Sequence, residues 1–129
     1  MNRLRHWLPV ALWAAVIFCF SARSAAPHVS QDPPVQLAVQ KLGHATEYAI
    51  LAFLLFRALR RGHRLPVRDA ALCAALLAAL YGVSDEWHQS FVPGRQCLLS
   101  DMAIDATSGA LAATALYVYE SRHRPTTDR

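Results

Sequence analysis

Clusters of ionisable and polar residues stand at the borders of three apolar runs in this sequence. They comprise Lys41, His44 and Glu47 before one run, Asp85, Glu86, His88 and Gln89 after the next, and Asp101 and Asp105 at the start of the last, with Arg95 in the intervening connection. Carboxylates and imidazoles can bind a cation or transfer protons, and a guanidinium can clamp phosphate or carboxylate. Which chemistry is open depends on whether the chain brings these clusters together.

Helical spacing places the members of each cluster on one side of a helix. Lys41, His44 and Glu47 are three residues apart, and Asp101 and Asp105 are four apart. An ionisable group at membrane depth costs about 2.5–3.5 kcal/mol on insertion scales, so it tends to face a bundle interior or a wet cavity. We therefore expect three helices to share one polar, ionisable pocket.

The composition favours a membrane protein of one domain, residues 1–129. Of the 129 residues, 54% are hydrophobic and 17% charged, which is too apolar for a typical soluble domain. Four apolar runs predict membrane spans at about residues 7–22, 41–60, 67–86 and 100–119. The fold class expected is an all-α membrane protein, a four-helix transmembrane bundle. A soluble bundle is disfavoured because the third run is apolar all round.

The N-terminal run permits two interpretations. Its basic start, apolar middle and small-residue end fit a cleavable secretory signal, but they also fit an uncleaved anchor, which we expect. In the following loop, Asp32 before Pro33 is typical of a helix cap. We expect a short interfacial helix from Val35 that leads into the second span.

The distribution of basic residues predicts the orientation. Ten of the 13 lysines and arginines fall in the N-terminus, the second connection or the C-terminal tail: Arg3, Arg5, Arg57, Arg60, Arg61, Arg64, Arg68, Arg122, Arg124 and Arg129. Basic residues in short loops stay cytoplasmic, so both termini are predicted to be cytoplasmic and the pocket to lie at the outer face. Because these residues lie between apolar runs and form no continuous basic face, we expect no nucleic acid partner.

Small residues predict how the helices pack. They recur every fourth position in the third and fourth spans: Ala70, Ala74, Ala78 and Gly82, and then Ala106 and Ala110. Such ridges let helix backbones approach closely, within the bundle or in a homo-oligomer. The three cysteines are an odd number and no disulfide framework. We expect them to be packing residues, with only Cys97 exposed.

Two stretches, KLGHATEYAILAFLL and YGVSDEWHQSFVPGRQCLLSDMAIDATSGALAA, closely resemble the VanZ-like family of small integral membrane proteins. The matching motifs are K-x-x-H-x-x-E-Y and D-E-x-H-Q-x-F-V-P-G-R, followed by an aspartate and a small-residue helix. Gln40 stands where the family often has an acid, and Ala113 where it often has glycine. The matched positions are Lys41, His44, Glu47, Tyr48, Asp85, Glu86, His88, Gln89, Arg95 and Asp101, with Asp105 beside them.

The resemblance implies a multi-pass protein of the bacterial cell membrane whose namesake is associated with tolerance to teicoplanin, a glycopeptide antibiotic. It supplies no reaction. From the residues, the pocket is expected to bind or modify a lipid headgroup or a lipid-linked envelope molecule, with Arg95 on its anionic group and a divalent cation as one means of offsetting the acids.

Three alternatives stay open. The first is a metal- or acid/base-dependent membrane hydrolase or transferase, with His44, Glu47, Asp85 and Glu86 as the catalytic candidates and His88 as an added metal ligand; no HExxH or comparable signature supports it. The second is a structural lock between helices through His44, Glu47, Asp85 and Arg95. The third is ion-coupled transport.

Overall fold

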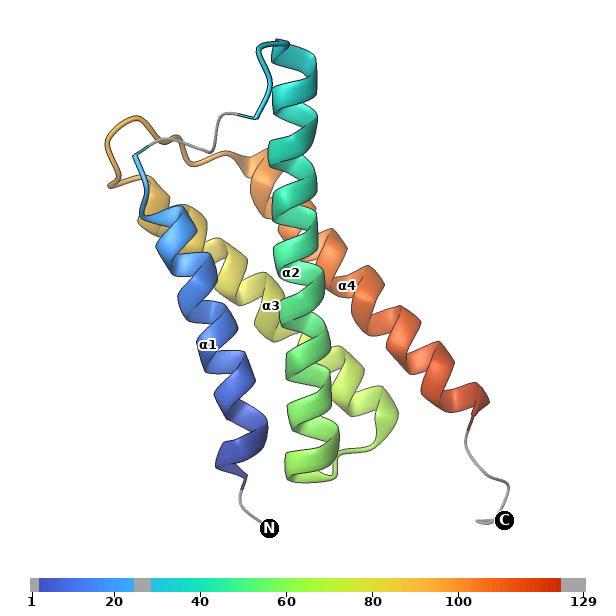
Figure 1. The fold of residues 1–129 in the computed structure, drawn as a ribbon. Coiled ribbons are helices and arrows are strands. Elements are labelled where there is room, and N and C mark those ends of the chain that lie inside the picture. Colours follow the sequence, from blue (N-terminus) through green and yellow to red (C-terminus); the bar gives the residue numbers. More distant parts are fainter. Residues whose placement is uncertain (1–2, 25–28, 124–129) are drawn as a thin grey trace, which may run out of the picture.

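The computed structural model describes residues 3–24 and 29–123, and within them the chain forms four helices and no strand. The helices are α1 (Leu4–Ser21), α2 (Pro33–His63), α3 (Val67–Gln89) and α4 (Leu99–Arg122). Successive helices run in opposite directions, so the start of α1 and the end of α4 lie at the same end of the bundle (Figure 1). The predicted all-α, four-helix class is confirmed.

Proline sets the start of α2, which is longer than the span expected there. Pro33 is the first helical residue, and Asp32 occupies the N-cap position without a side-chain cap hydrogen bond. The helix then runs without interruption for 31 residues. The separate interfacial helix predicted from Val35 is therefore wrong, because no proline or other strong breaker divides that segment from the following span.

Three of the helices, α1, α2 and α3, are long and apolar enough to cross a membrane by length and composition. Helix α4 has 24 residues and so the length of a span, but it carries Asp101, Asp105 and Glu120. The four helices extend beyond the predicted spans at several ends. Backbone hydrogen bonds continue past the apolar part of a helix into the polar residues that flank it.

Helix α3 turns its small residues inward and its large ones outward. Ala70, Ala74 and Ala78 are fully buried, whereas Leu72 and Leu76 are about 60% exposed. A soluble helix would bury its leucines, but a lipid-facing helix can expose them. This inverted arrangement supports membrane insertion more directly than composition does.

Close contacts between helices depend on two glycines. A Cβ added to Gly82 of α3 would lie 3.1 Å from Asp105 Cβ and 3.2 Å from Tyr48 Cε1, and one added to Gly109 of α4 would lie 3.1 Å from Ala78 Cβ. A larger residue at either position would require the neighbouring side chains to move by a few tenths of an ångström. These three helices thus form a mutually packed core.

The packed face of α4 differs from the predicted one. Gly109 and Ala113 are buried together with Asp105, whereas Ala106 is only half-buried and Ala110 is exposed. The observed ridge therefore lies three residues further along α4 than the predicted one. The buried acid and the glycine determine which side of α4 faces its neighbours. The predicted small-residue stripe on α3 packs against other helices of the same chain. A homo-oligomer stays a prediction.

Helix α1 is peripheral and packs on α2 and α3 but not on α4. Trp13 Nε1 donates a hydrogen bond to the Glu47 carbonyl (2.9 Å), and the Tyr81 hydroxyl donates to the Ala14 carbonyl (2.7 Å). Cys19 on α1 is exposed, as is Cys97. The prediction that only Cys97 would be exposed is wrong, because α1 has neighbours on one side only.

Candidate functional site

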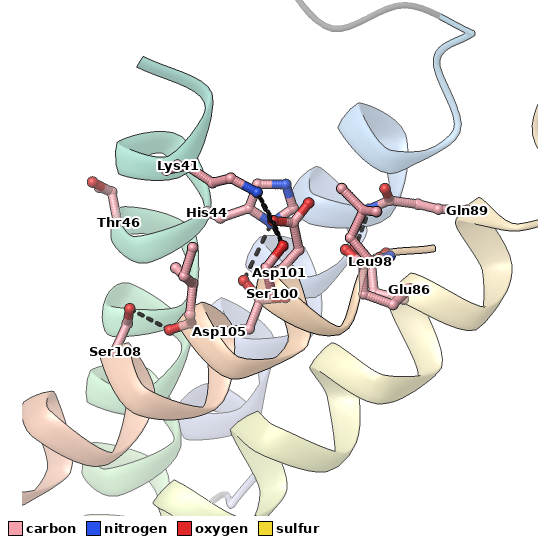
Figure 2. A network of polar contacts seen from close by, with 12 residues as sticks. Lys41, His44, Thr46, Glu86, Gln89, Leu98, Ser100, Asp101, Asp105 and Ser108 are labelled. Atoms are coloured by element: carbon pink, nitrogen blue, oxygen red, sulfur yellow. Dashed lines mark hydrogen bonds and ion pairs between the residues drawn. The ribbon is translucent and has the colours of Figure 1, made fainter. Parts of the chain in front are cut away.

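Two ion pairs join α2 to α4 near the start of both helices. Lys41 Nζ pairs with an Asp101 carboxylate oxygen, and His44 Nδ1 lies 3.2 Å from Asp105 Oδ1. Figure 2 shows Lys41 and His44 extending from α2 toward these two acids. The Asp105 side chain is fully buried and that of His44 is 15% exposed. The carboxylate accepts at Nδ1 and so fixes the orientation of the imidazole ring.

Helix α3 contributes two buried acids at the same level. Asp85 Oδ2 accepts a hydrogen bond from Gln89 Nε2, and Glu86 Oε2 accepts one from the Leu98 backbone N–H, each at 3.1 Å. The second bond ties the end of α3 to the residue that precedes α4. Asp85 and Glu86 are 5% and 0% exposed, so both carboxylates point into the protein.

A tight turn positions Arg95 between α3 and α4. The Arg95 N–H donates to the Val92 carbonyl (3.1 Å), and Gly94 has φ +80°. Proline followed by a glycine of positive φ is the pattern of a type II turn. A Cβ on Gly94 would also come within 2.9 Å of the Ser24 carbonyl. The turn therefore needs glycine, and it packs Gly94 against Ser24, which follows α1.

A cavity of about 680 Å³ opens at this end of the bundle. The predicted site residues that line it are Lys41, His44, Glu47, Asp85, Gln89, Arg95 and Asp101. The structure thus brings together residues from α2, α3, α4 and a connection. We call this cavity and the buried acids behind it the polar end.

Four predicted site residues do not line the cavity. Tyr48 and Asp105 are fully buried behind it, where they contact Gly82, and Glu86 is fully buried on α3. The His88 ring stacks on Phe18 of α1, with centroids 4.6 Å apart. His88 therefore serves the contact between α3 and α1.

Helix α1, helix α2 and the connection before α4 supply lining residues that the sequence did not predict. Ile17, Phe20 and Ser21 come from the last turns of α1, while Gln40 and Gln96 are neighbours in sequence of predicted site residues. Their adjacency to Lys41 and Arg95 was a usable signal for the two glutamines. No pattern within α1 indicated its part in the wall, because that depends on how α1 docks.

Buried polar atoms without a partner gather at the polar end. Among the described residues, these side-chain atoms are Ser21 Oγ, Tyr48 OH, Asp85 Oδ1, Glu86 Oε1, His88 Nε2, Arg95 Nε and Asp105 Oδ2. Buried polar atoms in proteins nearly always have a partner, so a concentration of exceptions requires a local explanation. A bound ligand or ion is one such explanation.

One group of residues has the geometry to hold a metal ion. His44, Glu86 and Asp101 each offer a ligand atom, and these atoms lie within 4.8 Å of one another. The predicted set shared His44 and Glu86 with this group but had Glu47, Asp85 and His88 in place of Asp101. His88 stacks on α1 instead, and α4 brings Asp101 close.

The ion pairs that join α2 to α4 are not those predicted for a structural lock. Of its four predicted members, only His44 forms an ion pair in the described part of the chain, and its partner is Asp105. Glu47 interacts electrostatically with His44 and Arg95, and also with Asp85 and Asp105. Lys41 likewise pairs with Asp101 across the helices.

The opposite end of the bundle carries a different cavity, of about 590 Å³. Its lining consists of basic residues only: Arg5, His6, Arg57, Arg60, Arg61 and Arg64. Arg60 Nε donates to Glu120 at 2.8 Å, and one of its terminal nitrogens donates to the Leu65 carbonyl at 2.6 Å. We call this region the arginine end. Arg124 and Arg129, which were counted among the cytoplasmic basic residues, lie outside the described residues.

Comparison with known proteins identifies the family. The family model described as VanZ/LLP1 matches residues 6–120, a region that includes nearly all of the four helices and the lining of the polar end. No curated protein and no solved structure matches the chain. With three helices able to span a bilayer and this match over most of its length, the chain belongs to the VanZ/LLP1 family and is a membrane protein.

Proposed function

We propose that this protein crosses the bacterial cell membrane four times, with both termini in the cytoplasm and the polar end at the outer face. The arginine end holds most of the basic residues of the short connections, which are retained on the cytoplasmic side. The polar end holds Glu47, Asp85, Glu86, Asp101 and Asp105. The two ends therefore have the charge asymmetry of an inserted protein.

We further propose that the polar end binds the anionic headgroup of a lipid or of a lipid-linked envelope molecule. The observation that carries this proposal is the mixed lining of the cavity. Ile17, Phe20 and Leu37 provide an apolar wall, and Lys41 and Arg95 provide cations beside it. An amphiphile needs both surfaces in one site, whereas a soluble ion needs only the second.

Arg95 is the best-positioned group for the anionic part of the ligand. It lines the cavity, and its Nε is buried without a partner among the described residues. A guanidinium presents a planar set of donors that matches phosphate or carboxylate. Gly94 constrains the turn that carries it. Binding at Arg95 would thus use a preformed donor.

Native mass spectrometry of the full chain tests headgroup binding directly. We expect wild type released from bilayers to retain an anionic lipid, and Arg95→Ala to weaken retention roughly tenfold or more, since charged hydrogen bonds contribute about 1.5–3 kcal/mol. Arg23→Ala is the matched control, because Arg23 is an exposed arginine near the same end that does not line the cavity. Equal retention by the two variants would reject the proposal.

The source of the headgroup is a second arm of the same experiment. Vesicles that contain phosphatidylglycerol represent bilayer lipid, and vesicles with a polyprenyl diphosphate represent lipid-linked envelope precursors. In cells, the family resemblance makes tolerance to teicoplanin the phenotype to measure. His44→Ala or Glu47→Ala that leaves expression intact but removes tolerance would support a site, whereas unchanged tolerance would favour the structural lock.

A second candidate function is acid/base or metal-dependent hydrolysis or transfer on the bound molecule. The specific observation in its favour is the His44–Asp105 pair, in which a fully buried carboxylate orients an imidazole at the cavity wall. Incubation of the protein with a polyprenyl diphosphate, followed by phosphate release, would test it. A rate equal to that of His44→Gln would reject catalysis by this pair.

A further inference from the structure

Negative charge exceeds positive charge at the polar end. Five carboxylates meet there, from Glu47, Asp85, Glu86, Asp101 and Asp105, whereas the fixed cations are Lys41 and Arg95. His44 can contribute one more positive charge. Arg23 and Asp32 are exposed at the same end and offset each other. With all five carboxylates ionised and His44 protonated, the excess is two negative charges, which is costly for groups removed from water.

Part of this excess resides on buried oxygen atoms that have no hydrogen-bond partner in the described chain. Glu86 is fully buried, with Oε2 bonded to the Leu98 N–H and Oε1 unpartnered. Asp105 Oδ2 and Asp85 Oδ1 are buried and unpartnered as well. A carboxylate kept dry in this way either takes up a proton or is stabilised by a cation, since hydrogen bonding to uncharged donors removes no net charge.

Three ligand atoms converge here from three different helices. His44 comes from α2, Glu86 from α3 and Asp101 from α4, with their ligand atoms within 4.8 Å of one another. Asp105 contacts Nδ1 of His44, so Nε2 is the ring nitrogen that is left to bind a cation. A carboxylate behind a histidine is the usual support of a metal-binding imidazole. Nitrogen with carboxylate oxygen suits zinc and other first-row divalent cations.

We propose that His44, Glu86 and Asp101 bind one divalent cation at the inner wall of the cavity. The cation neutralises the two excess charges and holds α2, α3 and α4 together at this end. His44 and Asp101 also line the cavity, so an open coordination position faces it. That position receives an oxygen of the anionic headgroup alongside Arg95, and this last step rests on the proposed function.

Metal binding by the full chain, without lipid, tests the site. The protein is purified in detergent through a tag that binds no metal, stripped with a chelator, and titrated with Zn²⁺ or Mn²⁺. We expect one ion per chain after desalting, and a loss of affinity in His44→Gln and Glu86→Gln of roughly tenfold or more. His123→Gln and Glu120→Gln, at the opposite end of α4, are the matched controls and should bind like wild type.

A spectroscopic readout covers the case in which Glu86→Gln fails to fold. Pulsed electron paramagnetic resonance of bound Mn²⁺ should detect a nitrogen ligand in wild type and lose it in His44→Gln. Asp105→Asn removes the charge behind the imidazole and should weaken binding about 10- to 100-fold while the nitrogen signal stays. Metal content no higher in wild type than in His44→Gln would overturn the proposal.

The outcomes separate this inference from the proposed function. Metal bound by a chain that retains no anionic lipid would support the cation site and reject headgroup binding. Lipid retention that is unchanged by the chelator, in a chain without metal, would reject the cation site and leave headgroup binding in place.

Discussion

At the polar end, most of the acids are buried and two of them pair with another helix, whereas at the arginine end most of the cations face outward. Asp105 is fully buried and paired with His44, but Arg61 and Arg64 are exposed and form no ion pair in the described chain. Buried charge must be compensated by defined partners, while exposed charge can rely on solvent and headgroups. One end therefore has the construction of a site, and the other that of a membrane anchor.

The largest effect should follow from reversing the charge difference between the ends. Arg57, Arg61 and Arg64 changed to Gln, together with Ser30→Arg and Gln31→Arg, move the basic bias to the other side of the membrane. We expect a fluorescent protein fused to the C-terminus, bright in the wild-type fusion, to lose most of its signal. A phosphatase fusion should gain activity in parallel. The two loop substitutions alone are the control, and an unchanged pattern would contradict the proposed orientation.

Helix packing at the polar end should be the next most sensitive feature. Gly82→Val forces a side chain against Asp105 and Tyr48, at 3.1 and 3.2 Å from the first added carbon. Overpacking of this kind costs about 1–3 kcal/mol. Gly43→Val is the control, because nothing lies within 4 Å of a Cβ there. Unfolding midpoints in mixed detergent should fall for Gly82→Val only. Equal midpoints would mean that the helices are less closely packed than described.

The most buried ion pair of the polar end should be stronger than the ion pair of the arginine end. His44–Asp105 has side-chain exposures of 15% and 0%, and Arg60–Glu120 has 26% and 33%. Double-mutant cycles with His44→Gln and Asp105→Asn should give a coupling energy of about 1–3 kcal/mol. The equivalent cycle with Arg60→Gln and Glu120→Gln should give about 0–1 kcal/mol. Similar values in unfolding measurements would remove the distinction between the ends.

The smallest effect is expected from single arginines at the cavity of the arginine end. Arg61→Gln should weaken retention of phosphatidylglycerol by about 1 kcal/mol, a factor of about five, because it removes one cation near anionic headgroups. Arg68→Gln removes an exposed cation at the same end that does not line the cavity. A larger loss in Arg61→Gln would mark the cavity as a lipid site. Equal losses that vanish at high salt would mean that these arginines attract anionic headgroups only by general electrostatics.

Much of the fold could be predicted because hydrophobic runs and helix periodicity are local properties. The four apolar runs and their order could be located from composition along the chain, through residues such as Leu72 and Ala74, without any knowledge of contacts. The same local reasoning failed for Ala106 and Ala110, since small residues occur on several sides of α4 near them. The contacts of Asp105 with Gly82 and of Gly109 with Ala78 decide which side of that helix is buried.

The ionisable clusters could likewise be found from their spacing, but their partners could not. Spacing gave Lys41 and His44 one face of a helix, and the structure pairs them with Asp101 and Asp105 of α4. A helix specifies which of its own residues share a side. It does not specify which side of another helix will meet them, because that depends on crossing geometry.

By itself, the sequence determined an all-α membrane protein, the placement of its basic residues and the set of groups available for chemistry. Composition, charge and helical period are sufficient for these conclusions. The tertiary structure alone decided that α1 forms part of the cavity wall, that Glu86 and Asp105 lie behind it, and that His44, Glu86 and Asp101 meet. These features depend on how close the helices come, and that distance is set by contacts between residues far apart in the chain, above all at Gly82 and Gly109.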